Sequence, residues 1–189
     1  MHTPFIVIIT GLPGTGKTTL GRTLSDKYKF VFVSKDALKE RMFDALGWSD
    51  KAWSLKVSAA SHRIMDDIIA QELRAGHPVI VESNFKHGID SERFRNIQAQ
   101  YGCPLLQILC WADGETVYRR FAGRIGTEAR HKGHVEALPL ETIHQEFLAI
   151  KGKDKPLDIP GTTIELDTSN IDAIDYQKID DAIDHAIAA

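Results

Sequence analysis

The sequence predicts an α/β fold in which helices cover both faces of a parallel sheet. Short apolar runs alternate along the chain with longer stretches of helical periodicity, as they do when parallel strands are joined by right-handed helical crossovers. The runs Phe5–Ile9 and Leu105–Trp111 are apolar at nearly every position, which is typical of strands that are buried on both faces. A glycine-rich segment follows the first run and indicates the subclass, a P-loop NTPase.

Five strands and at least six helices are expected from these patterns. The expected strands are Phe5–Ile9, Phe30–Val33, Val79–Glu82, Leu105–Trp111 and Thr163–Leu166. The expected helices are about Lys17–Tyr28, Asp36–Leu46, Asp50–Ala75, Asp90–Tyr101, Asp113–Ile125 and a C-terminal helix with the apolar stripe Ile179, Ile183, Ala186 and Ile187. In the longest helix, the apolar stripe is expected to be Trp53, Val57, Ala60, Ile64 and Ile68.

Length and composition predict one domain over residues 1–189, with a short lid at about 124–136. The formal net charge of −3 argues against a general nucleic-acid binder. Cys103 and Cys110 are expected to be reduced and structural. We expect a cytoplasmic protein without a membrane anchor, because no secretory signal and no apolar segment of about 20 residues is visible. The oligomeric state is left open.

The segment Gly11–Thr18 matches the phosphate-binding pattern G-x-x-x-x-G-K-[ST] without a gap. Glycines let backbone N–H groups point inward at phosphate oxygens, and the following helix directs its positive end at the same anion. Lys17 supplies a charge for the β- and γ-phosphates, and the Thr18 hydroxyl is a ligand for Mg²⁺. The expected nucleotide-binding residues here are Gly11, Leu12, Pro13, Gly14, Thr15, Gly16, Lys17, Thr18 and Thr19. The predicted nucleotide is ATP with Mg²⁺.

Carboxylates follow the second and third expected strands. Ligands of an open α/β sheet bind at the carboxyl ends of its strands, so Asp36 and Glu82 should face the phosphate site. Asp36 is suited to orient an acceptor hydroxyl and accept its proton. Glu82 is suited to support Mg²⁺ through a water molecule. An acidic helix start is the structural alternative for Asp36.

Basic residues gather on the helix that begins near Asp113 and in the polar segment Gly126–Gly133. Arg124 and Arg130 are expected to stabilise the charge that develops during phosphoryl transfer, delivered by a closing lid. Arg120 lies four residues before Arg124 on the same helical face and is expected to contribute to nucleotide binding. The adenine ring is expected near this helix and the Asp167-Thr168-Ser169 turn.

These features favour an ATP-dependent kinase that phosphorylates a hydroxyl of a small molecule. A P-loop ATPase or a nucleotide-dependent regulatory module, neither with a phosphoryl acceptor, is the alternative. A GTPase is disfavoured because the chain contains no N-K-x-D. Candidates for the acceptor wall are Trp48, Trp53, Phe85 and Arg41, although such residues are more often core or cap residues.

The order "TGLPGTGKTTL … VSKDALKERMFDALG … VIVESNF … YRRFAGRIGTEARHKGH" resembles the small P-loop kinases related to phage polynucleotide kinase, zeta toxins and chloramphenicol phosphotransferase. The resemblance implies a five-stranded sheet of order 2-3-1-4-5, a catalytic role for Asp36 and phosphate contacts for Arg124 and Arg130. Lys39 stands where the phage enzyme has an arginine, which argues against a nucleic-acid 5′ end as substrate because lysine lacks the planar fork of arginine.

Overall fold

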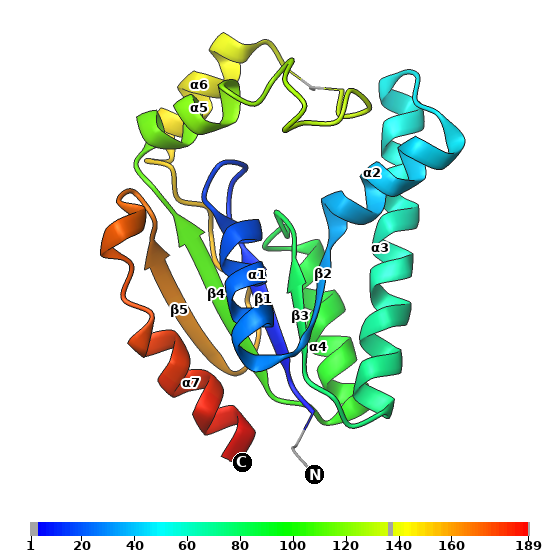
Figure 1. The fold of residues 1–189 in the computed structure, drawn as a ribbon, viewed down its shortest axis with the longest axis vertical. Helices are drawn as coiled ribbons and strands as arrows, with labels where there is room; N and C mark the ends of the chain where they lie inside the picture. Colours follow the sequence, from blue (N-terminus) through cyan, green and yellow to red (C-terminus); the bar gives the residue numbers. More distant parts are fainter. Residues whose placement is uncertain (1–3, 136–137, 189) are drawn as a thin grey trace.

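A five-stranded parallel sheet forms the centre of the computed structural model, which describes residues 4–135 and 138–188 (Figure 1). The strands are β1 (Ile6–Thr10), β2 (Val31–Ser34), β3 (Val79–Glu82), β4 (Leu105–Trp111) and β5 (Thr162–Asp167). Their order is β2-β3-β1-β4-β5, and every neighbouring pair is parallel. The expected fold class and strand order are therefore confirmed.

Helices cover both faces of this sheet, and alternate residues of β1 explain how. Val7 and Ile9 face a core that includes residues of α1 (Lys17–Tyr28) and α7 (Gln177–Ala188). Ile6 and Ile8 face the opposite core, which includes residues of α3 (Lys51–Arg74) and α4 (Ile89–Tyr101). Because successive strand residues point to opposite faces, a strand that is apolar throughout supplies both cores at once. Ile179 and Ile183 of α7 are fully buried, as expected from their spacing.

The buried stripe of α3 differs from the expected one. Met65 and Ile69 are fully buried and Val57 nearly so, whereas Ile64 is 38% exposed. Adjacent apolar pairs at 64–65 and 68–69 satisfy the 3.6-residue period in two alignments, so the pattern does not distinguish them. Packing against the sheet selects the alignment that contains Met65 and Ile69.

The remaining helices stand above the carboxyl edge of the sheet. Figure 1 shows α2 (Lys35–Leu46) and the start of α3 on one side of this edge, with α5 (Gly114–Ala122) and α6 (Leu140–Ala149) on the other. Helix α5 ends at Ala122, three residues earlier than expected, and α6 was not predicted. The short 3-10 helix η1 (Ile171–Ala173) precedes α7. None of the helices in the described ranges is long and apolar enough to cross a membrane.

Candidate active site

The loop between β1 and α1 is curled by three glycines with positive φ: Gly11 (138°), Gly14 (93°) and Gly16 (77°). An added Cβ on Gly11 would lie 2.1 Å from the carbonyl oxygen of Cys110, so only glycine fits there. Thr15 holds the curl because its hydroxyl and its N–H both donate to the carbonyl of Leu12, at 2.8 and 3.4 Å. The result is a cradle at the N-terminus of α1, the geometry that binds a phosphate chain.

Lys17, the first residue of α1, folds back over this loop. Its Nζ donates to the Leu12 carbonyl at 2.8 Å and lies 3.9 Å from Oε1 of Glu82. The residue is only 7% exposed. A buried ammonium needs such partners, and they hold the charge at the mouth of the cradle.

Glu82 ends β3 and lies beside the cradle. The sheet register pairs it with Ile9 on one side and Ser34 on the other. Its Oε2 accepts hydrogen bonds from Thr18 at 3.2 Å and Ser34 at 2.8 Å. Together with Lys17, these hydroxyls compensate the burial of the carboxylate. Hydroxyl and carboxylate oxygens are the ligands that Mg²⁺ prefers, so Thr18 and Glu82 fit the predicted ion.

Asp36 lies in the first turn of α2, two residues after the N-cap Ser34. Its Oδ1 is 2.6 Å from Nζ of Lys35, and the Asp36 side chain is 54% exposed. Partial burial raises the pKa of this carboxyl, but the nearby ammonium of Lys35, with smaller effects of His134 and Lys17, lowers it to about 2. Asp36 is therefore ionised throughout the physiological pH range.

One cleft of about 930 Å³ brings most of the predicted residues together. The predicted residues that line it are Leu12, Pro13, Gly14, Gly16, Lys17, Thr18, Thr19, Asp36, Glu82, Arg124 and Arg130. Gly11 and Thr15 belong to the same loop: Gly11 lies against the carbonyl of Cys110, and the hydroxyl of Thr15 donates to the carbonyl of Leu12. Arg120 is not among the lining residues.

Arg124 and Arg130 face the cleft from the segment that follows α5. Burial and the charge of Arg130 lower the pKa of Arg124, whose Nε is a buried donor with no partner in the described part of the chain. Arg130 places its guanidinium 5.2 Å from the ring centroid of Phe121. Two cations near enough for the charge of one to lower the pKa of the other favour an anion between them.

Arg120 has a different environment. Its guanidinium donates to the carbonyls of Thr168 at 2.9 Å and Ser169 at 3.2 Å, in the turn that follows β5. Thr168 in turn donates to the carbonyl of Thr15 at 3.1 Å. Arg120 thus ties α5 and the turn after β5 to the cradle. Its expected contact with the nucleotide stays a prediction.

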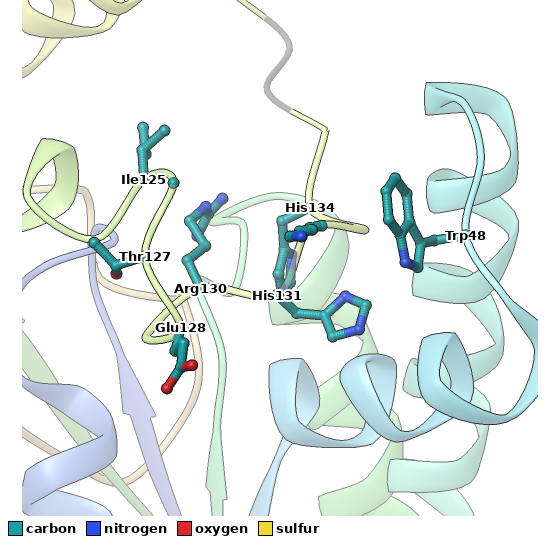
Figure 2. A pocket seen from close by; sticks show the side chains of 9 residues that line it. Trp48, Ile125, Thr127, Glu128, Arg130, His131 and His134 are labelled. Carbon is teal, nitrogen blue, oxygen red and sulfur yellow. The ribbon is translucent and has the colours of Figure 1, made fainter.

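The segment after Arg124 crosses to α2 and is fixed there by two histidines. Nε2 of His134 lies 2.9 Å from Oε1 of Glu40, and Nε2 of His131 lies 3.3 Å from Oδ1 of Asp44. Figure 2 shows both histidines projecting from this segment, with Arg130 beside them. The expected lid region therefore bridges the two sides of the cleft. Glu136, the last residue of the expected lid, lies outside the described residues.

Gly133 forms the centre of this contact. The ring of Phe43 packs so closely that a Cβ on Gly133 would lie 2.4 Å from it. Phe43 is 1% exposed and stacks on His131, with ring centroids 5.3 Å apart. Ser54 of α3 donates to the Gly133 carbonyl at 3.1 Å. The residues that bind the expected lid segment to α2 and α3 were not recognised in the sequence, because their partners lie 79 to 94 positions away.

The four side chains suggested for the acceptor wall do not line the main cleft. Phe85 is 2% exposed and packs edge-on against Phe94. Trp53 donates from Nε1 to the carbonyl of Gly47, at 3.0 Å, and Arg41 pairs with Asp44. Trp48 lines a neighbouring hollow of about 690 Å³, which shares Arg130 and His134 with the main cleft (Figure 2). The wall near Asp36 is instead polar.

Lining residues that sequence reasoning missed include Arg22, Lys35, Glu40, Lys86 and His134. Lys35 carried a usable signal, since it immediately precedes the predicted catalytic carboxylate and both lie at the end of β2. The others came from helix faces and loops that only the folded chain brings to the cleft.

This combination of sheet order, cradle and facing carboxylates defines a kinase-like P-loop nucleotide-binding protein. Residues 6–148 match the family model described as an AAA domain, and the chain belongs to that family.

Relatives agree with this class. A solved structure from Chloroflexus aurantiacus, described as that of a candidate kinase, is 36% identical; the match covers 97% of this chain and 98% of that one, with a TM-score of 0.88. The adenylate kinase isoenzyme 6 homolog of Caenorhabditis elegans is 27% identical over 89% of this chain and 86% of its own length. A gluconokinase from Sinorhizobium meliloti shares the fold, with 16% identity, a TM-score of 0.51 and coverage of 100% of this chain and 92% of that one.

Proposed function

We propose that this protein is an ATP-dependent kinase that transfers the γ-phosphate to a hydroxyl group of a small polar molecule. The observation that carries the proposal is the single cleft that Lys17, Asp36, Glu82 and Arg124 share. A kinase needs a cradle for the phosphates, oxygen ligands for Mg²⁺, an acidic group for the acceptor and cations for the developing charge. The described residues supply each of these.

The ionisation of Asp36 supports an alcohol rather than a phosphate acceptor. Relatives named as an adenylate kinase homolog and as cytidylate kinases carry the names of nucleotide kinases, so a phosphate acceptor is the natural competitor. With a pKa of about 2, Asp36 carries a negative charge at the point where the acceptor would approach. That charge repels a phosphate, whereas it accepts a hydrogen bond from a neutral hydroxyl.

The cleft wall around Asp36 supports a polar acceptor. Glu40, Asn84, Lys86 and His134 line the cleft together with Asp36, and they offer both donors and acceptors. As far as the structure describes this part of the wall, it contains no Phe, Tyr or Trp ring; Phe121 and Phe147 also line the cleft but pack with Leu12 of the cradle and Ile143 of α6. A small molecule with several hydroxyl groups, such as a sugar or polyol, satisfies such a wall better than a flat aromatic compound.

The chemistry assigns one task to each residue. Asp36 accepts the hydrogen bond of the acceptor hydroxyl and directs its oxygen at the γ-phosphorus; the new P–O bond forms as the bond to the oxygen of the ADP product breaks. Asp36 shares the hydroxyl proton while that bond forms, and the proton then leaves to solvent. Lys17 and Arg124 stabilise the charge on the phosphoryl oxygens. Thr18, and Glu82 through a water molecule, would hold Mg²⁺, and that ion would neutralise phosphate charge.

Asp36→Asn tests the proposal in a panel of sugars, polyols, sugar acids and nucleosides, with ATP consumption as the readout. We expect one or more of these compounds to stimulate ATP consumption, and the variant to lose about 100- to 10,000-fold of that rate while binding ATP as tightly as wild type. Asp180→Asn is the matched control, because Asp180 also lies in a helix first turn but outside the cleft. Asp180→Asn keeps the stimulated rate.

Two results contradict the proposal. If Asp36→Asn turns over normally, Asp36 does not act on the acceptor. If ATP hydrolysis is fast and insensitive to every acceptor, the protein is an ATPase without a phosphoryl acceptor.

A further inference from the structure

Helix α2 begins with two adjacent residues of opposite charge and opposite exposure. The Lys35 side chain is 9% exposed and that of Asp36 is 54% exposed, yet Nζ and Oδ1 are 2.6 Å apart. Both residues line the main cleft. A lysine side chain normally extends into water, and burying its ammonium is costly unless a partner compensates it. Asp36 is that partner.

The position of Lys35 follows from the end of β2. Ser34 caps α2 and binds Glu82, so the chain enters the helix beside the phosphate cradle. Lys35 is therefore the first residue of α2, and its ammonium pairs with the carboxylate of the next residue, Asp36. The pair forms on the wall of the cleft that faces Lys17.

Several charges face the Asp36 carboxylate besides Lys35. They come from three other segments of the chain: Lys17 at the cradle, Arg124 after α5 and His134 in the lid. The ammonium of Lys35 is in direct contact with this carboxylate, with Nζ 2.6 Å from Oδ1. Coulomb attraction falls with distance, so Lys35 has the largest influence on this carboxylate.

We propose that Lys35 is a positioning residue that holds the Asp36 carboxylate in place and keeps it ionised for the incoming acceptor hydroxyl. This inference rests on the proposed function and adds a residue to it. An ionised carboxylate only accepts hydrogen bonds, whereas a protonated one presents an O–H to the acceptor and no longer directs the attacking oxygen. Without Lys35, the burial of Asp36 acts with less opposition and favours the protonated form.

NMR titration of the Asp36 side chain in ¹³C-labelled protein tests the inference without any need for turnover. In the wild-type protein, where the pKa of Asp36 is about 2, the carboxyl stays ionised at pH 4. In Lys35→Met, we expect Asp36 to titrate at or above its ordinary pKa of 3.8. Lys35→Arg keeps the cation and is expected to restore the wild-type titration.

Lys27→Met is the matched control. Lys27 forms an ion pair of the same length, 2.6 Å, with Asp180, outside the main cleft. Lys27→Met changes the titration of Asp180 and leaves that of Asp36 as in wild type. Circular dichroism confirms that each variant is folded before it is titrated, and Lys35→Gln replaces Lys35→Met if the latter is unfolded.

Kinetics with a stimulating acceptor give the second readout. We expect the acid limb of kcat/KM in Lys35→Met to move to higher pH by about as much as the Asp36 titration, with kcat lowered at pH 5 and rescued by Lys35→Arg. Two results overturn the inference: an Asp36 titration unchanged by Lys35→Met, or a raised acceptor KM with an unmoved pH profile, which marks Lys35 as a direct acceptor contact. A shifted titration without any stimulating acceptor supports the pairing and contradicts the proposed kinase activity instead.

Discussion

Replacing Gly11 by alanine tests whether close packing beneath the cradle shapes the phosphate site. Gly11 leaves β1 with φ of 138°, and the Cβ of an alanine would lie 2.1 Å from the carbonyl oxygen of Cys110 and 3.1 Å from Oγ1 of Thr15. Ordinary van der Waals contact begins near 3.4 Å. Since the neighbour is backbone at the end of β4, it cannot rotate away as a side chain would.

The expected cost is the sum of two effects. Backbone strain of a non-glycine residue in this conformation is about 1–3 kcal/mol. Overpacking against a fixed backbone atom adds about 1–3 kcal/mol. The free energy of unfolding should therefore fall by about 2–6 kcal/mol, a large share of the 5–15 kcal/mol that is typical of a folded domain.

Urea unfolding followed by circular dichroism measures this change in the free energy of unfolding. Titration with a fluorescent ATP analogue measures how tightly the cradle binds a nucleotide. We expect analogue affinity to fall by about tenfold or more, because a displaced loop misdirects several N–H groups at once. Gly102→Ala is the control: it also has positive φ, 64°, but an added Cβ meets nothing within 4 Å. Its cost should be about 1–2 kcal/mol, with unchanged analogue binding.

The reasoning is refuted if both variants lose the same stability and bind the analogue equally well. Such a result would mean that backbone strain alone matters and that the contact with Cys110 relaxes without moving the cradle. Loss of analogue binding in Gly102→Ala would equally count against it, because that residue ends α4 far from the phosphate site along the chain.

Two further predictions concern the lid and the C-terminal helix. Gly133→Ala sets a Cβ against the ring of Phe43, so we expect the lid segment to separate from α2 and limited proteolysis to cut it faster. In the control Gly88→Ala, the added Cβ meets nothing within 4 Å, so its cleavage rate should stay near that of wild type. Equal cleavage rates in the two variants contradict this prediction. Burial raises the pKa of Asp180, but hydrogen bonding, led by Lys27, outweighs it and lowers the pKa. A carboxyl whose pKa is lowered in the folded state stabilises the fold at pH values above its unfolded pKa of about 4, and this stabilisation is lost as the pH falls. Lys27→Met should therefore be less stable than wild type at pH 7 and nearly as stable as wild type at pH 3. A stability difference that is the same at both pH values rejects this prediction.

The strands and the cradle were predictable because their signals are local. Residues 79–82 and 105–111 were assigned to strands with the bounds that the structure has, since continuous apolar runs report burial on both faces. The loop from Gly11 to Thr18 is recognisable because its glycines and Lys17 act within a few positions of one another. The placement of Asp36 and Glu82 near the cradle followed from one general rule about the carboxyl ends of parallel strands.

Other features depended on contacts between distant parts of the chain. Helix α6 went unpredicted because its short pattern is decided by packing: Phe147 meets Phe121 edge-on, with ring centroids 5.8 Å apart. The buried face of α3 differs from the predicted one because Ile64 and Met65 are similarly apolar, and only packing against the sheet decides which of them is buried. Trp48, Trp53, Phe85 and Arg41 do not line the main cleft, and Phe85 belongs to the core, the alternative that its residue type left open.

The sequence by itself determined the class of fold, the phosphate cradle and the acidic residues at the strand ends, because short-range spacing and backbone chemistry carry that information. The tertiary structure alone decided that Arg120 is tied to the turn after β5 and that His131 and His134 fix the expected lid segment to α2. The physical reason is range: a glycine loop is set by its own dihedral angles, whereas the partner of a side chain depends on which elements packing brings within a few ångströms.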